Sequence, residues 1–217
     1  MFFRKSIVAA TGLFLCIFLI VHLSANAILL LPETTARELY NSYSTALREN
    51  LFITLIAYLL YISIILHVVY AAIITFRNTK SKGEKYKVNH NNKNSTWMSQ
   101  NMGFLGVFIL LFIVVHLANF WAKIKLGIGE DVGVDVNGNV DVYEVTSFLF
   151  HNMYFMLFYS VLMIPLGFHL YHGLKSAFMT LGFYHKKGLR LLAKISLAYA
   201  IIMSVGFGII PLFVYFK

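Results

Sequence analysis

The sequence predicts an all-α membrane protein with five transmembrane helices, and three observations support this prediction. Hydrophobic residues make up 59% of the 217 residues, whereas charged residues make up only 12%. The mean hydropathy is +0.73, and a water-soluble domain of this size could not bury so much apolar surface. Five apolar runs also reach the length of about 20 residues that a helix needs to cross a bilayer. We therefore expect lipid to surround most of the chain.

The chain reads as a single transmembrane domain, 1–217, without a soluble domain in any loop. The expected spans are residues 6–31, 51–76, 100–121, 148–181 and 189–216. The fourth span is longer than a bilayer requires, so we expect it to project from the membrane. Of the three prolines, Pro32 should end the first span, Pro165 should kink the fourth, and Pro211 lies near the exit of the fifth.

The charged residues predict the direction of each span. Basic residues precede the first span and follow the second and fourth: Arg4, Lys5, Arg77, Lys80, Lys82, Lys85, Lys87, Lys93, Lys186, Lys187, Arg190 and Lys194. The other two loops carry most of the acidic residues. By the positive-inside rule, the N-terminus is cytoplasmic and the C-terminus is outside. This topology explains the net charge of +9 without a nucleic-acid partner, because the basic residues line no amphipathic face.

Residues 1–27 also fit a second interpretation, a cleaved signal peptide ending in Ala25-Asn26-Ala27. The apolar run is longer than a usual signal-peptide core, which favours a span. The external stretch around Asn137-Gly138 is typical of a small hairpin. Cys16 is the single cysteine, so no disulfide or cysteine-ligated cluster can form within the chain.

An internal repeat aligns two of the histidines. Residues 11–25, TGLFLCIFLIVHLSA, match 105–119, LGVFILLFIVVHLAN, without a gap, and His22 then lies over His116. A weaker match places His67 over His169 and Ala71 over Gly173. The pattern indicates two copies of a helix pair plus one extra helix.

Depth in the membrane gives the same pairs. His22 lies seventeen residues after Lys5, and His116 lies seventeen after Ser99, so both belong to the outer half at 1.5 Å per residue. His67 comes ten residues before Arg77, which places it in the inner half. His169 comes six residues before Lys175 and belongs to the same level. An ionisable side chain inside a membrane span is energetically costly, so it usually has a function. Two pairs of histidines at matching depths suggest one.

Two neutral imidazoles on opposite sides of one flat ring are what a haem iron with two protein ligands requires. We therefore predict a four-helix bundle that binds two b-type haems, plus one additional helix. His22 and His116 would ligate the outer haem iron, and His67 and His169 the inner. His172, three residues after His169, could replace it as ligand, or contact a propionate or a quinone.

Further candidates lie near the predicted interfaces. Lys175 and Arg77 could bind propionates of the inner haem, although basic residues at this depth commonly reach lipid headgroups. Glu49 is the carboxylate best placed to carry protons on the quinone side, or it is a solvated loop acid. The remaining histidines are expected in solvent: His90, His151 and His185.

Four segments resemble the cytochrome b membrane anchor of succinate dehydrogenases and fumarate reductases, in its single-subunit, five-helix, dihaem form. They are FLIVHL at 18–23, ILHVVYA at 65–71, FIVVHLANFW at 112–121 and GFHLYHGLKSAFMTLG at 167–182. The resemblance implies the same ligand pairs as the depth argument. It also implies flavoprotein and iron–sulfur subunits on the cytoplasmic side of a bacterial inner membrane. Some members have a glutamate shortly before the fourth-helix ligand, where this chain has Gly167 and Phe168, so that proton path is in doubt.

The resulting hypothesis is an anchor that passes electrons between an iron–sulfur partner and a membrane quinone, expected to be menaquinone, with no dicarboxylate chemistry on this chain. Cytochrome b subunits of hydrogenases or formate dehydrogenases are an alternative with the same two haems. A haem-free transporter or proton channel with histidines along its path is a further one. A di-iron membrane enzyme would require several motifs of closely spaced histidines. Only His169 and His172 are spaced in a similar way.

Overall fold

The computed structural model describes residues 2–81, 97–129, 132–182 and 188–217. Its elements are α1 (Phe2–Asn26), η1 (Ala27–Leu30), α2 (Glu33–Glu49), α3 (Leu51–Ser81), α5 (Trp97–Gln100), α6 (Met102–His116), η2 (Leu117–Ala122), α7 (Lys123–Leu126), α8 (Val142–Phe150), α9 (Met153–Val161), α10 (Met163–Thr180) and α11 (Leu189–Phe216). Within these residues the chain is helical apart from turns and one isolated β-bridge, between Val134 and Val140.

Five helical segments are long and apolar enough to cross a membrane, as the sequence predicted. They are Phe3–Leu30, Leu51–Lys80, Met102–Leu126, Met153–Thr180 and Leu189–Phe216. Few of their side chains are buried inside the protein, and large apolar side chains are exposed along all five. Helices of this kind are stable only where lipid covers them. The all-α, five-helix, multi-pass architecture is thus confirmed.

The fourth span differs from its expected bounds. Residues 148–150 belong to the separate helix α8, and Asn152 caps the span itself by accepting from the backbone N–H groups of Tyr154 and Phe155. The span is then interrupted at Leu162, three residues before Pro165. Proline lacks an N–H and its ring crowds the carbonyl four residues earlier, which explains the interruption there.

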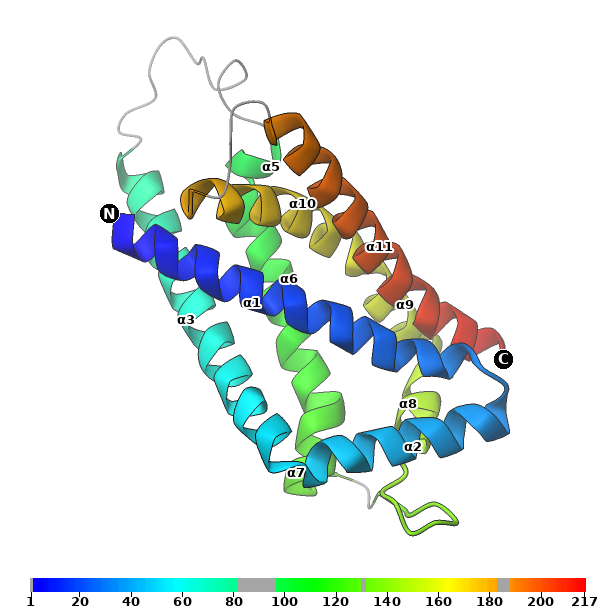
Figure 1. Ribbon diagram of the computed structural model, residues 1–217. Helices are drawn as coiled ribbons and strands as arrows, with labels where there is room; N and C mark the ends of the chain where they lie inside the picture. Colours follow the sequence, from blue (N-terminus) through cyan, green and yellow to red (C-terminus); the bar gives the residue numbers. More distant parts are fainter. Residues whose placement is uncertain (1, 82–96, 130–131, 183–187) are drawn as a thin grey trace.

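Helix α1 lies across the bundle and contacts α3, α10 and α11 (Figure 1). Helix α10 packs against both α11 and α6, and α11 also packs against α9. Helix α3 packs mainly along α1, and no side chain of its most apolar stretch is buried. The four histidine-bearing spans α1, α3, α6 and α10 are therefore neighbours, and α11 is the additional helix.

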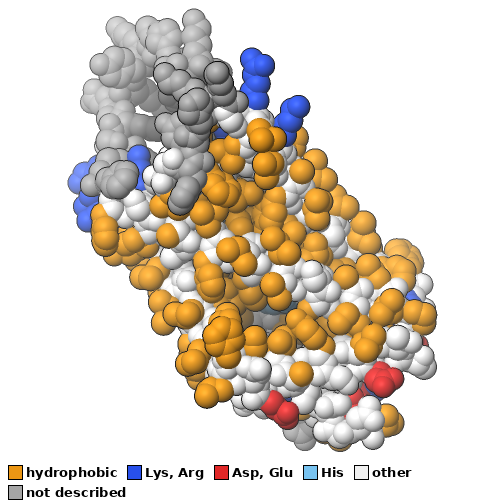
Figure 2. Space-filling model, viewed as in Figure 1, with side chains coloured by type: hydrophobic (Ala, Val, Ile, Leu, Met, Phe, Trp, Pro, Cys, Tyr) orange, Lys and Arg blue, Asp and Glu red, His pale blue; other side chains and the backbone are white. Residues whose placement is uncertain are grey.

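Basic residues gather at one end of the molecule, and the acidic residues of the described ranges gather at the other. Figure 2 shows lysine and arginine side chains at one end, and aspartate and glutamate at the other. We call the first the basic end; its described residues include Arg4, Lys5, Arg77, Lys80, Arg190 and Lys194. The second is the acidic end, with Glu33, Glu38, Glu49, Asp135, Asp141 and Glu144. The apolar surface between them is the region that a bilayer would cover.

The connection after the first span is a helix, where the sequence analysis assumed a loop. Helix α2 runs from Glu33 to Glu49 across the acidic end (Figure 1) and packs against α8 and η1. Its buried side chains, Ala36, Tyr40 and Asn41, recur at the spacing of one helical face. An acidic residue in the first turn and Arg48 in the last suit the helix dipole.

Helix α2 is tied to α8 by a buried polar cluster. Asn41, fully buried, donates to Asp141 Oδ1 at 2.9 Å and accepts from the backbone N–H of Tyr143 at 2.9 Å. Arg37 donates through Nε to Asp141 Oδ2 at 2.9 Å. Asp141 also caps α8 by accepting from the Glu144 N–H at 3.0 Å. One carboxylate therefore joins two elements that lie a hundred residues apart in sequence.

Charge at Asp141 is stabilised by this cluster. Burial acts to raise the pKa of its carboxyl, but hydrogen bonds from Asn41, the Glu144 N–H and Arg37 outweigh burial, so the pKa lies below the ordinary 3.8.

The neighbouring expected hairpin is present in small form: the Asn139 carbonyl accepts from Asp135 N at 2.8 Å, and Gly138 has a φ of 79° that glycine adopts readily.

Candidate functional site

His22 on α1 and His116 at the end of α6 lie against each other. Their ring centroids are 5.8 Å apart and the ring planes meet at 83°. Aromatic side chains enclose the pair: Phe18 and Phe207 contact the His22 ring, and Phe112, Phe120 and Tyr159 contact the His116 ring. Both imidazoles therefore have apolar surroundings. We call these two residues the His22 pair.

His67 on α3 and His169 on α10 form a second contact, the His67 pair. Their ring centroids are 6.3 Å apart, with the planes at 65°. Gly12 of α1 lies beside it, and a Cβ added there would come within 3.2 Å of His67 Cε1. The glycine therefore permits the close approach of α1 to the His67 ring.

The two pairs occupy two levels of the bundle. His67 contacts Thr11 and Gly12, whereas His22 itself belongs to the other pair. Eleven residues separate Thr11 from His22 on one regular helix, which is about 16 Å along its axis. The His67 pair lies nearer the basic end and the His22 pair nearer the acidic end.

A hydroxyl on α1 sets the tautomer of His67. Thr11 Oγ1 lies 2.7 Å from the Ile7 carbonyl oxygen, to which its only proton is donated, and 3.1 Å from His67 Nδ1. With that proton on the Ile7 carbonyl, Thr11 accepts from the ring, and the tautomer assigned to His67 has its hydrogen on Nδ1. In this tautomer the lone pair of His67 is on Nε2.

His22 also has a polar neighbour on α1. Asn26 Nδ2 donates to the His22 carbonyl oxygen at 2.8 Å and lies 3.4 Å from His22 Nδ1. Tyr40 of α2 donates to Asn26 Oδ1 at 3.1 Å. Burial raises the pKa of Tyr40 to about 12, so its hydroxyl keeps this proton at physiological pH. Helix α2 thus reaches the His22 pair through two side chains.

The other member of each pair has an unpartnered ring nitrogen. His116 Nδ1 and His169 Nδ1 are buried without a hydrogen-bond partner. Such a nitrogen is destabilising unless something binds it. Directly after His116 the helix widens into the π-helical turn η2, a local departure from α geometry that the sequence did not predict.

The remaining predicted site residues lie apart from the ring contacts. His172 is partly buried on α10, one turn beyond His169, and the ring against His67 is that of His169. Lys175 is partly buried further along α10, and Arg77 is exposed near the end of α3. Glu49 is exposed at the last position of α2. His151 is exposed, as expected, and its Nδ1 lies 2.7 Å from the Ser147 carbonyl oxygen.

Some predictions fall on residues outside the described ranges. These are His90 and His185 and most of the two basic loops, including Lys82, Lys85, Lys87, Lys93, Lys186 and Lys187. The surface that would face peripheral subunits is therefore described only at its helical edges.

Sequence reasoning missed the side chains that surround the histidines. Thr11 precedes His22 by eleven residues, close to three helical turns, so its place on the same face could have been read from the spacing. Tyr159 and Phe207 gave no such signal, because the paired histidine of the fourth span, His169, belongs to the other pair and α11 carries no histidine. Their contacts with His116 and His22 arise from tertiary packing.

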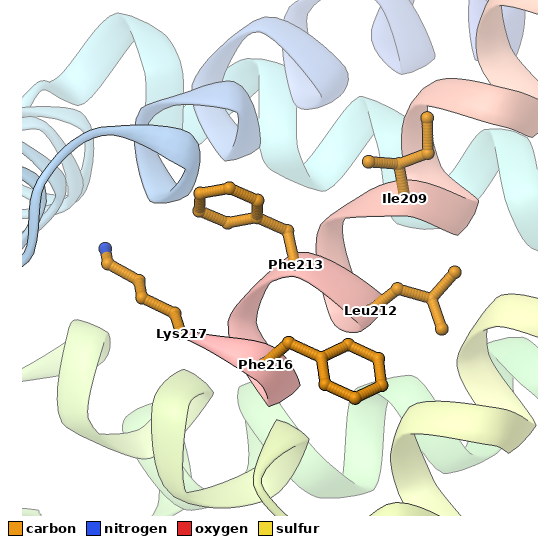
Figure 3. Close-up of a pocket in the computed structure, with 5 residues that line it drawn as sticks. All are labelled: Ile209, Leu212, Phe213, Phe216 and Lys217. Atoms are coloured by element: carbon orange, nitrogen blue, oxygen red, sulfur yellow. The ribbon is translucent and has the colours of Figure 1, made fainter.

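A separate apolar hollow of about 350 Å³ lies at the end of α11 (Figure 3). It is lined by Ile209, Leu212, Phe213, Phe216 and Lys217. Lys217 Nζ donates to the Leu31 carbonyl oxygen at 2.6 Å. None of the four paired histidines lines this hollow, so it is not part of the candidate site.

Comparisons of the chain with protein-family models, with curated proteins and with solved structures give no match.

Proposed function

We propose that the chain is the dihaem cytochrome b membrane anchor of a succinate dehydrogenase or fumarate reductase. His22 and His116 would hold one haem, and His67 and His169 the other. The protein would relay electrons between a cytoplasmic iron–sulfur subunit and a membrane quinone, menaquinone in our proposal. The observation that carries the proposal is that four intramembrane histidines from four spans meet as two separate pairs.

The spacing within each pair fits one metal ion between two rings. An imidazole nitrogen bonds a divalent metal at about 2 Å, so two rings that hold one ion lie close together. The observed separations are 5.8 and 6.3 Å. Each pair also has one buried ring nitrogen without a hydrogen-bond partner, His116 Nδ1 or His169 Nδ1, which adds a chemical reason for a ligand in both places.

The residues of this chain would bind, orient and shield the cofactors. Bound haem supplies reversible one-electron transfer. Thr11 holds the His67 ring in the tautomer that a metal needs, and second-shell contacts of this kind raise ligand basicity. Phe18, Phe112 and Phe207 keep water from the His22 pair. Ligand type, burial and second-shell contacts are the means by which a protein tunes a haem potential.

The charge distribution supports the remaining parts of the proposal. With the basic end in the cytoplasm, the His67 pair is the inner and the His22 pair the outer one. A bacterial inner membrane with flavoprotein and iron–sulfur partners at the basic end is then the natural setting. Two levels about 16 Å apart along α1 would form a relay across the membrane.

Haem quantitation on purified protein tests the proposal. We expect two b-type haems per chain, and we expect His22→Ala and His67→Ala each to lose one haem, and a different one. His151→Ala is the matched control, because that histidine is exposed and unpaired with another ring; it should keep both haems.

Three results would contradict the proposal at different levels. Wild-type protein without haem absorbance would favour the transporter or proton-channel alternative. Retention of both haems in His22→Ala and His67→Ala would show that the pairs are not the ligands. Co-purification with hydrogenase or formate dehydrogenase subunits would be compatible with the two haems, but it would show that the chain belongs to a different complex.

A further inference from the structure

Arg4, in the first turn of α1, is partly buried, and one nitrogen of its guanidinium is enclosed by the protein. Its Nη1 atom is shielded from solvent and meets no hydrogen-bond partner. A guanidinium stays charged at any physiological pH, and a buried N–H of such a group is destabilised unless an acceptor binds it, most strongly an anion. The structure therefore points to an anion beside Arg4.

Helix geometry places Arg4 on the face of α1 that serves both histidine pairs. Thr11 follows Arg4 by seven residues, nearly two turns, and His22 follows it by eighteen, which is five turns. Thr11 contacts the His67 ring, and His22 belongs to the other pair. Lys5, the next residue, is rotated about 100° away and is exposed.

No carboxylate of the described residues supplies the missing anion. The acidic residues within the described part of the chain lie at the acidic end, beyond the His22 pair. Arg4 lies on the other side, about 10 Å along the helix axis from Thr11 and toward the basic end. The nearest candidate site for a cofactor is thus the His67 pair.

We propose that Arg4 binds a propionate carboxylate of the haem held by His67 and His169. This inference rests on the proposed function. The planar fork of a guanidinium matches a carboxylate through two parallel N–H···O bonds, and the two propionates are the anions that a haem brings with it. Arg4 was not among the basic residues that the sequence suggested for this role; Arg77, one of those, is exposed.

Redox titration of the purified two-haem protein tests the inference. Reduction adds an electron, and a nearby positive charge favours it. Arg4→Gln should therefore lower the midpoint potential of the haem at the His67 pair. The equilibrium constant for its reduction should fall roughly tenfold, as expected for unit charges about 10 Å apart at an effective dielectric constant of about 20. Arg4→Lys should restore most of the wild-type potential.

Lys5→Gln is the matched control, because it removes the same charge from the neighbouring, exposed residue. For each of the two haems, the equilibrium constant for reduction in this variant should stay within about twofold of the wild-type value. Either ligand variant identifies the redox transition that belongs to the haem at the His67 pair. It is the transition that His22→Ala retains and that His67→Ala lacks. One stable variant of the two is therefore enough for the assignment.

The outcomes separate this inference from the proposed function. Protein without haem would overturn both. Two haems whose potentials respond equally to Arg4→Gln and Lys5→Gln, or a shift confined to the His22-pair haem, would overturn the role of Arg4 alone. So would loss of a bound phospholipid from Arg4→Gln in native mass spectrometry with both potentials unchanged, because Arg4 would then bind a lipid phosphate.

Discussion

At the scale of single residues, the two pairs share one asymmetry. The member that belongs to or touches α1 has a polar neighbour on that helix: Thr11 for His67 and Asn26 for His22. The opposite members, His116 and His169, have Nδ1 atoms without partners. Helix α1 thus supplies a polar contact to one histidine of each pair, in addition to carrying His22 itself.

Thr11→Val tests the contact with His67. Valine has nearly the same shape but no oxygen, so the buried Nδ1–H would lose its acceptor, a change of about 1–3 kcal/mol. A less basic ligand stabilises oxidised iron less, so we expect a higher midpoint potential for the His67-pair haem. Haem affinity at this site should fall by about 10–100-fold, the usual range for second-shell changes. Redox titration and haem retention measure both effects.

Thr11→Ser is the control for that prediction, because it keeps the hydroxyl and should preserve the potential. The predicted direction is opposite to that of Arg4→Gln. Equal behaviour of the valine and serine variants would mean that the hydroxyl does not act on His67.

At the scale of elements, α2 is the part of the fold that binds the acidic end together. It is amphipathic, and it contacts α8 through Asn41, Arg37 and Asp141 and the first span through Tyr40 and Asn26. Since Asn26 also contacts His22, the packing of α2 bears on the geometry of the His22 pair.

Asn41→Ala should loosen α2 from α8. The change removes the partner of Tyr143 N–H and one partner of Asp141, each worth about 1–3 kcal/mol when left buried and unsatisfied. We expect a loss of about 2–4 kcal/mol, measured by hydrogen exchange of the α2 and α8 amides. Ser42→Ala, on the exposed face of the same helix, should change stability by less than about 0.5 kcal/mol.

Acid should weaken the same contact. The pKa of Asp141 is lower in the fold than its ordinary value of 3.8, so its contribution is complete above that value and is lost as the pH falls below it. The unfolding temperature of the wild type should therefore decline below about pH 4. Asp141→Asn should be less stable at pH 7, and its curve should approach the wild-type curve in acid. Parallel curves would contradict this role of Asp141.

At the scale of the whole molecule, charge separation along the bundle axis is the dominant feature. The basic and acidic ends lie on opposite sides of an apolar belt formed by five spans (Figure 2). The positive-inside rule converts that separation into an orientation, and the orientation decides which haem would face the cytoplasmic partner.

Cysteine labelling tests the orientation. In a Cys16→Ala background, a cysteine at exposed Asn137 should react with a membrane-impermeant maleimide added to intact cells. A cysteine at Lys5 should react only after the membrane is opened. The reverse pattern would place the basic end outside and would exchange the inner and outer pairs.

Much of the architecture follows from the sequence by itself, because it depends on local quantities. Apolar length determines the number of spans, and charge determines the expected orientation. The rise of 1.5 Å per residue determines which histidines can share a level. These quantities also predicted the partners His22 with His116 and His67 with His169, which the structure brings together. Their role as haem ligands remains a prediction.

Tertiary structure alone decided the features that depend on rotation and packing between helices. The sequence left His169 and His172 open, and only the rotation of α10 brings the His169 ring against His67. The loop assumed after the first span became α2 because its buried face has α8 to pack against. The burial of Arg4 Nη1 and the contact of Thr11 with His67 likewise require the neighbouring helices in place. Hydropathy records depth in the membrane, but it does not record which way a helix faces.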